Sequence, residues 1–218
     1  MIVNERIITF INSFEKAGNP CLTTIEEEAL GRNIPIIRKE TQSLLKVLLS
    51  IQKPMRILEI GTAVGFSALL MSEWVDFACS IVTIERDERL ITVAQSNIRK
   101  LGKEGQITLL HGDAKEELPK LTKPFDFIFM DAAKGQYLSF FPEIFRLLIP
   151  GGVLVSDNVL QEGDIVESRY AITKRDRTIH DRMREYLYLL KHHDELVTTI
   201  LTVGDGVAVS SRCGVLKR

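Results

Sequence analysis

Cysteine, histidine and tryptophan are scarce in this 218-residue chain, which contains 3, 4 and 1 of them. Cys21, Cys79 and Cys213 form no Cys-x-x-Cys pair and no metal-ligand cluster, so we expect reduced thiols and a cytoplasmic protein. No apolar run approaches the ~20 residues that a membrane-spanning helix needs. The N-terminus carries Glu5 and Arg6 and lacks the cleavage site of a signal peptide, so we expect no membrane association.

An excess of either charge is also missing, because 28 Lys and Arg residues nearly balance 29 Asp and Glu residues. The chain as a whole is therefore not a polycation, and any contact with nucleic acid must come from a local basic patch. Its length suffices for one α/β domain with a full core. Because no linker, repeat or low-complexity segment divides it, we expect a single domain, with a helical cap over residues 1–51 and an α/β core over residues 55–218.

The stretch Met55–Ser67, MRILEIGTAVGFS, joins a short apolar run to two glycines four residues apart. It predicts a buried strand, a tight turn at Gly61 and Gly65, and a helix that begins at the turn. Glycine lets a ligand approach the backbone closely, and the helix start offers unpaired N–H groups. The spacing matches neither the dinucleotide fingerprint nor the phosphate loop, and Glu59 would repel a pyrophosphate. We expect a ligand that is not a pyrophosphate and carries positive charge; an ordinary strand–helix turn is the alternative.

Strand and helix signals alternate from residue 55 onward. The expected strands share short apolar runs and cover residues 57–60, 80–84, 107–110, 125–130, 153–156, 196–203 and 206–211. The expected helices share apolar residues at helical spacing and cover residues 3–14, 24–31, 40–51, 67–75, 88–100, 114–121, 136–148 and 175–192. This order predicts a doubly wound α/β fold with a mainly parallel seven-stranded sheet and an antiparallel C-terminal hairpin. The N-terminal helices should cover one face of the sheet or the ligand site.

Acidic residues end consecutive predicted strands, at Glu59, Glu85, Asp113, Asp131 and Asp157. In sheets of this kind the ligand binds at the C-terminal ends of the strands. Glu85 lies about 20 residues past the glycine turn, where an acid is placed to hold ribose hydroxyls. A helix N-cap is the common explanation for one such acid, and it stays open for Asp113. Five of them on one edge favour a binding site.

Asp131, Asp157 and Asn158 form a second group, which offers only oxygen ligands from neighbouring strand ends. Hard oxygen ligands without Cys or His suit Mg²⁺, Mn²⁺ or Ca²⁺ rather than zinc. Lys134 follows closely, and a nearby divalent ion favours its neutral form, which can act as a general base. The alternatives are a capping Asp beside an Asn in a turn, and a solvated surface lysine.

Taken together, these motifs resemble a known enzyme family. The resemblance rests on EIGTAVGFS from Glu59 to Ser67, Glu85, Asp113-Ala114, DAAKGQY from Asp131 to Tyr137, and DNV from Asp157 to Val159. The motifs are similar to those of the metal-dependent, S-adenosylmethionine-dependent O-methyltransferases of the catechol and caffeoyl-CoA group, from about Ile34 to Ser210. The resemblance implies a Rossmann-like methyltransferase fold. Within the group, the chain looks most like the bacterial tRNA 5-hydroxyuridine methyltransferases.

The resemblance also implies roles for individual residues. The residues that would bind S-adenosylmethionine are Ile37, Glu59, Gly61, Ser67, Glu85, Asp113, Ala114 and Asp131. The residues that would hold Mg²⁺, Mn²⁺ or Ca²⁺ are Asp131, Asp157 and Asn158. Asp131 and Lys134 would be catalytic, with Lys134 as the base, and Tyr137 would line the acceptor site. Family members are usually dimers, so a second copy of the chain is an expected partner.

A basic segment near the C-terminus bears on the acceptor. Its basic residues are Arg169, Lys174, Arg175, Arg177, Arg182, Arg184 and Lys191. A solvated helix face with i,i+4 ion pairs is the default explanation. The functional one is a phosphate patch, with Arg175 and Arg177 in contact with RNA or a CoA thioester. The closer resemblance favours a tRNA anticodon stem-loop whose 5-hydroxyuridine is splayed into the site. A catechol-like small acceptor and a non-catalytic cofactor-binding module remain alternatives.

Overall fold

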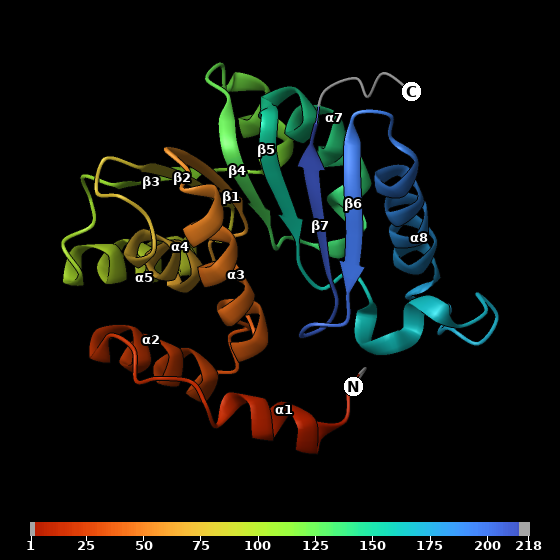
Figure 1. Ribbon diagram of the computed structural model, residues 1–218, viewed down its shortest axis with the longest axis horizontal. Helices are drawn as coiled ribbons and strands as arrows, with labels where there is room; N and C mark the ends of the chain where they lie inside the picture. The colour runs from red at the N-terminus through yellow and green to blue at the C-terminus, as the bar shows by residue number, and fades with distance from the viewer. Residues whose placement is uncertain (1–2, 214–218) are drawn as a thin grey trace.

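The computed structural model describes residues 3–213, and its seven strands form one sheet in the order β3-β2-β1-β4-β5-β7-β6 (Figure 1). The strands are β1 (Arg56–Ile60), β2 (Ser80–Glu85), β3 (Ile107–His111), β4 (Phe125–Met130), β5 (Leu148–Ser156), β6 (Leu196–Leu201) and β7 (Val207–Arg212). Strands β1 to β5 pair in parallel, whereas β7 runs antiparallel to both β5 and β6. The predicted fold class, a mainly parallel seven-stranded sheet with an antiparallel C-terminal hairpin, is confirmed.

The helices lie close to their predicted positions. They are α1 (Glu5–Asn12), α2 (Pro20–Gly31), α3 (Lys39–Gln52), α4 (Phe66–Glu73), α5 (Glu88–Lys100), α6 (Ala114–Glu117), α7 (Tyr137–Leu147) and α8 (Arg177–His192), with short 3-10 helices η1 (Leu118–Lys120), η2 (Lys134–Gln136) and η3 (Gln161–Val166). None of the helices in residues 3–213 has the length and apolar character needed to cross a membrane. All three cysteines carry free thiols.

One helix begins earlier than predicted. Helix α2 starts at Pro20, and the Oδ1 atom of Asn19 caps it by accepting a 2.9 Å hydrogen bond from the Cys21 backbone N–H. Proline suits the first turn because no intrahelical partner is available for an N–H there. The hydroxyl of Thr24 instead donates to the Pro20 carbonyl from inside the helix, at 3.1 Å. The expected helix start at residue 24 is wrong, because the Asn-Pro pair begins this helix rather than ending the one before it.

Apolar side chains pack on both faces of the sheet, and helices cover each face (Figure 1). Successive residues of a strand point to opposite faces. In β4, Phe127 and Phe129 therefore join the core under α2, α3 and α4, whereas Ile128 and Met130 join the core under α7 and α8. This packing fixes the strands relative to one another. It aligns the C-terminal ends of β1, β2, β4 and β5 along one edge.

Helix α1 differs from the others because it buries none of its side chains. Ile7, Phe10 and Ile11 are each more than half exposed, and so is Phe14 just beyond the helix. Figure 1 shows α1 apart from the sheet, at the bottom of the view. Helices α2 and α3 thus cover one sheet face, as expected of the N-terminal region, while α1 presents an apolar surface to solvent.

Candidate active site

A cavity of about 370 Å³ opens at the C-terminal ends of β1, β2 and β4. The segment before α3, the glycine loop after β1, and the residues that follow β2, β3 and β4 form its walls. It is lined by all but one of the residues predicted to bind the cofactor, namely Ile37, Gly61, Ser67, Glu85, Asp113, Ala114 and Asp131. The exception is Glu59, whose side chain is fully buried beside the cavity wall.

The glycine loop brings the ends of β1 and β4 together. Gly61 has a φ of +99°, and a Cβ atom on it would collide with the carbonyl of Asp131. Gly65 has a φ of +83° and is the N-cap of α4. Both positions need glycine, the first for close approach as well as for its left-handed backbone. The close approach explains how Asp131 can lie next to the loop that the sequence singled out.

Backbone N–H groups hold the acids at the ends of β2 and β3. The Glu85 carboxylate accepts hydrogen bonds from the N–H groups of Ala63 (2.9 Å), Arg86 (2.9 Å) and Asp87 (3.0 Å). A carboxylate has about four lone-pair sites, so one remains for a ligand hydroxyl. Asp113 caps α6 by accepting from the Lys115 N–H at 3.0 Å, and this bond lowers the pKa of its carboxyl. Asp113 is thus both a helix cap and part of the cavity wall.

Glu59 is a buried acid close to the cavity. The hydroxyl of Thr83 donates to Glu59 Oε2, and Oε1 has no hydrogen-bond partner among residues 3–213. Burial raises the pKa of Glu59 to about 7, against the smaller opposing effect of the Ser67 and Thr83 hydroxyls. A cation in the adjacent cavity would favour the ionised form of this carboxyl. This agrees with the expectation that the ligand carries positive charge.

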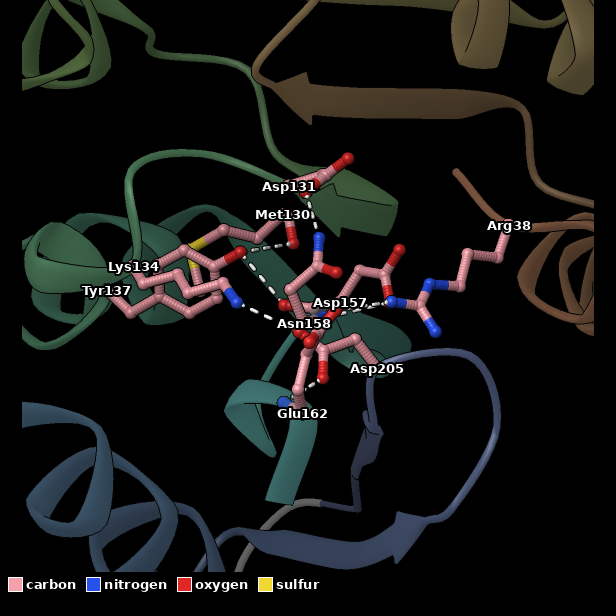
Figure 2. Close-up of polar contacts among 9 residues, drawn as sticks. All are labelled: Arg38, Met130, Asp131, Lys134, Tyr137, Asp157, Asn158, Glu162 and Asp205. Carbon is pink, nitrogen blue, oxygen red and sulfur yellow. Dashed lines mark hydrogen bonds and ion pairs between the residues drawn. The ribbon is translucent and has the colours of Figure 1, made fainter. Parts of the chain in front are cut away.

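The residues predicted to hold a metal ion come together at the ends of β4 and β5. The side-chain Nδ2 of Asn158 donates to Asp131 Oδ1 at 2.7 Å, and its backbone N–H donates to Asp157 Oδ1 at 2.8 Å (Figure 2). Asn158 has a φ of +59°, a left-handed conformation that asparagine tolerates better than most residues. Its side chain can therefore turn back toward Asp131 instead of continuing away from the strand.

The donor set of this cluster fits a hard divalent cation. Burial raises the pKa of both Asp131 and Asp157, and the neighbouring Asp131 charge raises that of Asp157 further. A divalent cation between them would relieve this repulsion. In residues 3–213 no three His, Cys, Asp or Glu side chains are grouped to hold a metal ion, so a site here needs the Asn158 amide oxygen. Half a turn of that amide would present Oδ1 where Nδ2 now lies.

Lys134 lies beside this cluster, in η2, and its Nζ donates to Asp205 Oδ2 at 2.9 Å (Figure 2). The Asp205 side chain is only 4% exposed, and its other oxygen accepts from the Glu162 backbone N–H. Asp205 was not predicted as a site residue. Its Gly-Asp-Gly context signals only a turn, and no spacing rule connects it with a lysine 71 residues away.

Tyr137 was predicted to line the acceptor site, but it is buried and is not among the residues that line the cavity. Its side chain is fully buried, with its ring edge-on to that of Tyr186. Its hydroxyl lies 3.2 Å from the Met130 carbonyl oxygen and 3.0 Å from that of Asp157. The tyrosine therefore lies behind the acidic cluster, out of reach of an acceptor in the cavity.

The basic segment borders the site without entering the cavity. The guanidinium of Arg182 donates to the Gly135 carbonyl at 3.1 Å, directly beside Lys134. Arg177 donates to the Ile172 carbonyl at 3.2 Å, whereas Arg175 is exposed. Neither Arg175 nor Arg177 lines the cavity. Part of this charge thus serves the packing of α8, and Lys174 and Arg175 face solvent.

Comparison with known proteins assigns the family. A family model described as O-methyltransferase matches residues 17–213. A catechol O-methyltransferase of Mycobacterium tuberculosis is 29% identical over 209 residues, 92% of each chain. A catechol O-methyltransferase of Niastella koreensis is 29% identical over 168 residues, 75% of this chain and 70% of that protein.

A solved structure agrees with these relatives. The Bacillus cereus O-methyltransferase in complex with SAH has a TM-score of 0.83 and 25% identity, and the match covers 94% of this chain and 96% of that one. The geometry of the strand ends and the comparisons lead to the same assignment. The chain belongs to the O-methyltransferase family, and the prediction that it is an S-adenosylmethionine-dependent O-methyltransferase is confirmed.

Proposed function

We propose that this enzyme methylates the 5-hydroxyl of a 5-hydroxyuridine in a tRNA anticodon loop, with a divalent cation at its active site. The observation that carries the proposal is the double position of Asp131, which lines the cavity and also accepts a hydrogen bond from Asn158 in the acidic cluster. Methyl transfer is an in-line displacement that needs donor and acceptor side by side. A donor in the cavity and an acceptor oxygen at the cluster would meet at this residue.

The cofactor and the divalent cation would supply the positive charges that the reaction needs. When bound, S-adenosylmethionine provides a methyl group on a positive sulfonium, and Mg²⁺, Mn²⁺ or Ca²⁺ provides a charge that lowers the pKa of an acceptor hydroxyl. Glu85 has a free lone pair for the ribose hydroxyls of the donor. Asp131, Asp157 and Asn158 would hold the cation.

Lys134 is the proposed general base. Its neutral amine would take the proton of the acceptor hydroxyl, and the oxygen would then bond to the methyl carbon as the carbon–sulfur bond breaks. The ammonium that forms would be stabilised by Asp205, whose carboxylate lies 2.9 Å from Nζ. Asp205 also fixes the direction of the amine, because its second oxygen is tied to the Glu162 backbone.

The basic surface beside the site supports an RNA acceptor. Lys174 and Arg175 are exposed before the start of α8, and Arg182 joins that helix to the segment that carries Lys134. Phosphates of an RNA loop would bind such a surface in a salt-dependent way. A catechol-like acceptor is the second candidate, favoured by relatives that are themselves named catechol O-methyltransferases.

Methyl transfer from labelled S-adenosylmethionine to hydroxyuridine-containing tRNA and to catechol would separate the candidates. We expect labelled tRNA, no labelling in EDTA, and recovery with Mg²⁺. Replacing Lys174 and Arg175 by Ser should weaken tRNA methylation and reduce its salt dependence while S-adenosylhomocysteine affinity stays the same. Labelling of catechol alone would support the second candidate. Labelling of neither, with cofactor still bound, would indicate a non-catalytic cofactor-binding module.

We also propose that two copies of the chain associate through the apolar surface of α1. The exposed Ile7, Phe10 and Ile11 support this, because they cover no core of their own chain. Sedimentation should then give twice the 24.6 kDa mass of one chain. Phe10→Glu should give single chains with unchanged cofactor affinity. A wild-type protein that sediments as a single chain would contradict the proposal.

A further inference from the structure

We propose that Tyr137 is a positioning residue, whose buried hydroxyl sets the separation of the Asp131 and Asp157 carboxylates. This inference rests on the proposed cation site. It assigns no contact with substrate to Tyr137, whose side chain is fully buried. Figure 2 shows its hydroxyl between the carbonyl of Met130 and the segment that carries Asp157.

One hydroxyl contacts the backbone on both strand ends. Tyr137 Oη lies 3.2 Å from the Met130 carbonyl oxygen, on the residue before Asp131, and 3.0 Å from the carbonyl oxygen of Asp157 itself. The Asp157 N–H donates to the same Met130 carbonyl at 3.0 Å. The single hydroxyl proton is thus shared between two carbonyl oxygens, and together with the Asp157 N–H it joins the backbone around the two carboxylates.

The same residue connects these strand ends to the proposed base. Tyr137 is the first residue of α7 and directly follows η2, the short helix that begins at Lys134. A change in the position of its hydroxyl would therefore act on both acids and on the amine. The Tyr137 ring has little room to move, because it packs edge-on against the ring of Tyr186 in the core. The two ring centroids are 5.6 Å apart.

The hydrogen bonds of the Tyr137 hydroxyl should affect the binding of a cation more than the binding of a neutral ligand. Ligands of a divalent ion must be held at fixed separations, and loss of the hydrogen bonds that support them typically weakens metal affinity about 10- to 100-fold. The cofactor cavity shares Asp131 with the cluster, but most of its lining comes from the glycine loop and from the residues that follow β2 and β3. Removing the hydroxyl should therefore weaken cation binding and leave cofactor binding nearly unchanged.

The alternative is that the Tyr137 hydroxyl only stabilises the fold. Tyr186 is a matched control that tests this alternative. Tyr186 is equally buried in the same core, and its hydroxyl bonds to Ser156 Oγ at 2.7 Å. Tyr186→Phe removes a buried hydroxyl that bonds to a β5 side chain, that of Ser156, rather than to the backbone carbonyls of Met130 and Asp157. Both Phe variants should lower the free energy of unfolding by similar amounts, on the order of 1 kcal/mol for one lost hydrogen bond.

The test is a Mn²⁺ titration of wild type, Tyr137→Phe and Tyr186→Phe, followed by electron paramagnetic resonance. We expect Tyr137→Phe to bind Mn²⁺ about 10- to 100-fold more weakly, with S-adenosylhomocysteine affinity within about twofold of wild type. Tyr186→Phe should match wild type in both titrations. Equal Mn²⁺ affinity in all three proteins, or an equal loss in both variants, would overturn the role of Tyr137 alone.

Failure of the cation site itself would look different, because wild type would then bind no Mn²⁺, which would overturn both proposals. Should Tyr137→Phe fail to fold, 3-fluorotyrosine at position 137 gives a second readout. Its fluorine resonance should shift when Mg²⁺ is added, whereas the same label at position 186 should not respond. An unresponsive label at position 137 would equally overturn the inference.

Discussion

At one half of the strand-end edge, formed by β1, β2 and β3, the acids on the cavity wall are fixed by backbone N–H groups. Three such groups bind Glu85, and the Lys115 N–H lowers the pKa of Asp113. At the other half, formed by β4, β5 and the hairpin, burial raises the pKa of Asp131 and Asp157 instead. The Glu85 and Asp113 carboxylates are already held by backbone N–H groups, whereas the Asn158 amide can turn to present its oxygen.

The half formed by β1, β2 and β3 is therefore preformed, whereas the half formed by β4, β5 and the hairpin is completed by its ligand. Acids that already accept several N–H bonds are held in place without a cation and can accept hydroxyl groups of a neutral ribose. Buried acids that repel each other are stabilised when a proton neutralises one of them or when a cation lies between them. The first half therefore suits the methyl donor, and the second suits a cation with the acceptor oxygen. The predictions that follow test this division.

The largest effect should come from Asp157→Asn. This change removes one of two buried carboxylates, so methyl transfer should fall by about 10³-fold or more, since a catalytic metal contributes several kcal/mol. In EDTA the variant should unfold at the same or a higher temperature than wild type, because a repulsion is removed. Initial rates and thermal unfolding check this. Full activity of the variant in EDTA would refute the metal assignment.

Lys134→Met should have the next largest effect. Loss of a positioned general base typically costs about 10²- to 10⁴-fold in rate, so kcat should drop by that amount. Cofactor affinity should stay within about twofold, since Lys134 does not line the cavity. Asp205→Asn, which keeps the amine and removes its partner, should give an intermediate rate. An unchanged kcat in Lys134→Met would remove this residue as the base.

Glu59 should make the stability of the metal-free protein depend on pH. Its pKa is raised from 4.5 to about 7, so the folded state binds its proton more tightly than the unfolded state does. Its contribution is therefore retained below pH 4.5 and lost as the pH rises toward 7, by at most about 3 kcal/mol. Urea unfolding in EDTA should show Glu59→Gln gaining stability over wild type at pH 8 but not at pH 4. A gain that does not change with pH would contradict this.

The smallest effect should come from Glu85→Gln. The amide cannot accept from all the N–H groups that the carboxylate accepts from, so S-adenosylhomocysteine should bind about tenfold more weakly. Mn²⁺ affinity should not change, because Glu85 belongs to the preformed half. Calorimetric titrations of both ligands check the two statements. A matching loss of Mn²⁺ affinity would mean that the two halves are coupled.

Most of the fold could be predicted from local sequence patterns. Helix α5 and strand β4 have the bounds that apolar periodicity predicts, because each depends on residues close in sequence. Parallel strands share one edge, so the acids at their ends could be predicted to gather there. The early start of α2 was missed, since an Asn-Pro pair can either end or begin a helix.

The parts of the site that were missed depend on contacts between distant segments. Asp205 reaches Lys134 only because β7 inserts next to β5 in the sheet, which a turn motif cannot reveal. Tyr137 follows the DAAK stretch and so resembles a site residue in sequence. Its direction is decided by the core around Tyr186, where its ring is buried. Only three-dimensional packing distinguishes these two outcomes.

Paired titrations of S-adenosylhomocysteine and Mn²⁺ into Glu85→Gln and Asp157→Asn test the central claim most directly. We predict that Glu85→Gln loses affinity for S-adenosylhomocysteine alone and that Asp157→Asn loses affinity for Mn²⁺ alone. If Asp157→Asn binds Mn²⁺ as tightly as the wild-type protein does, no cation lies at the ends of β4 and β5, and the account is contradicted.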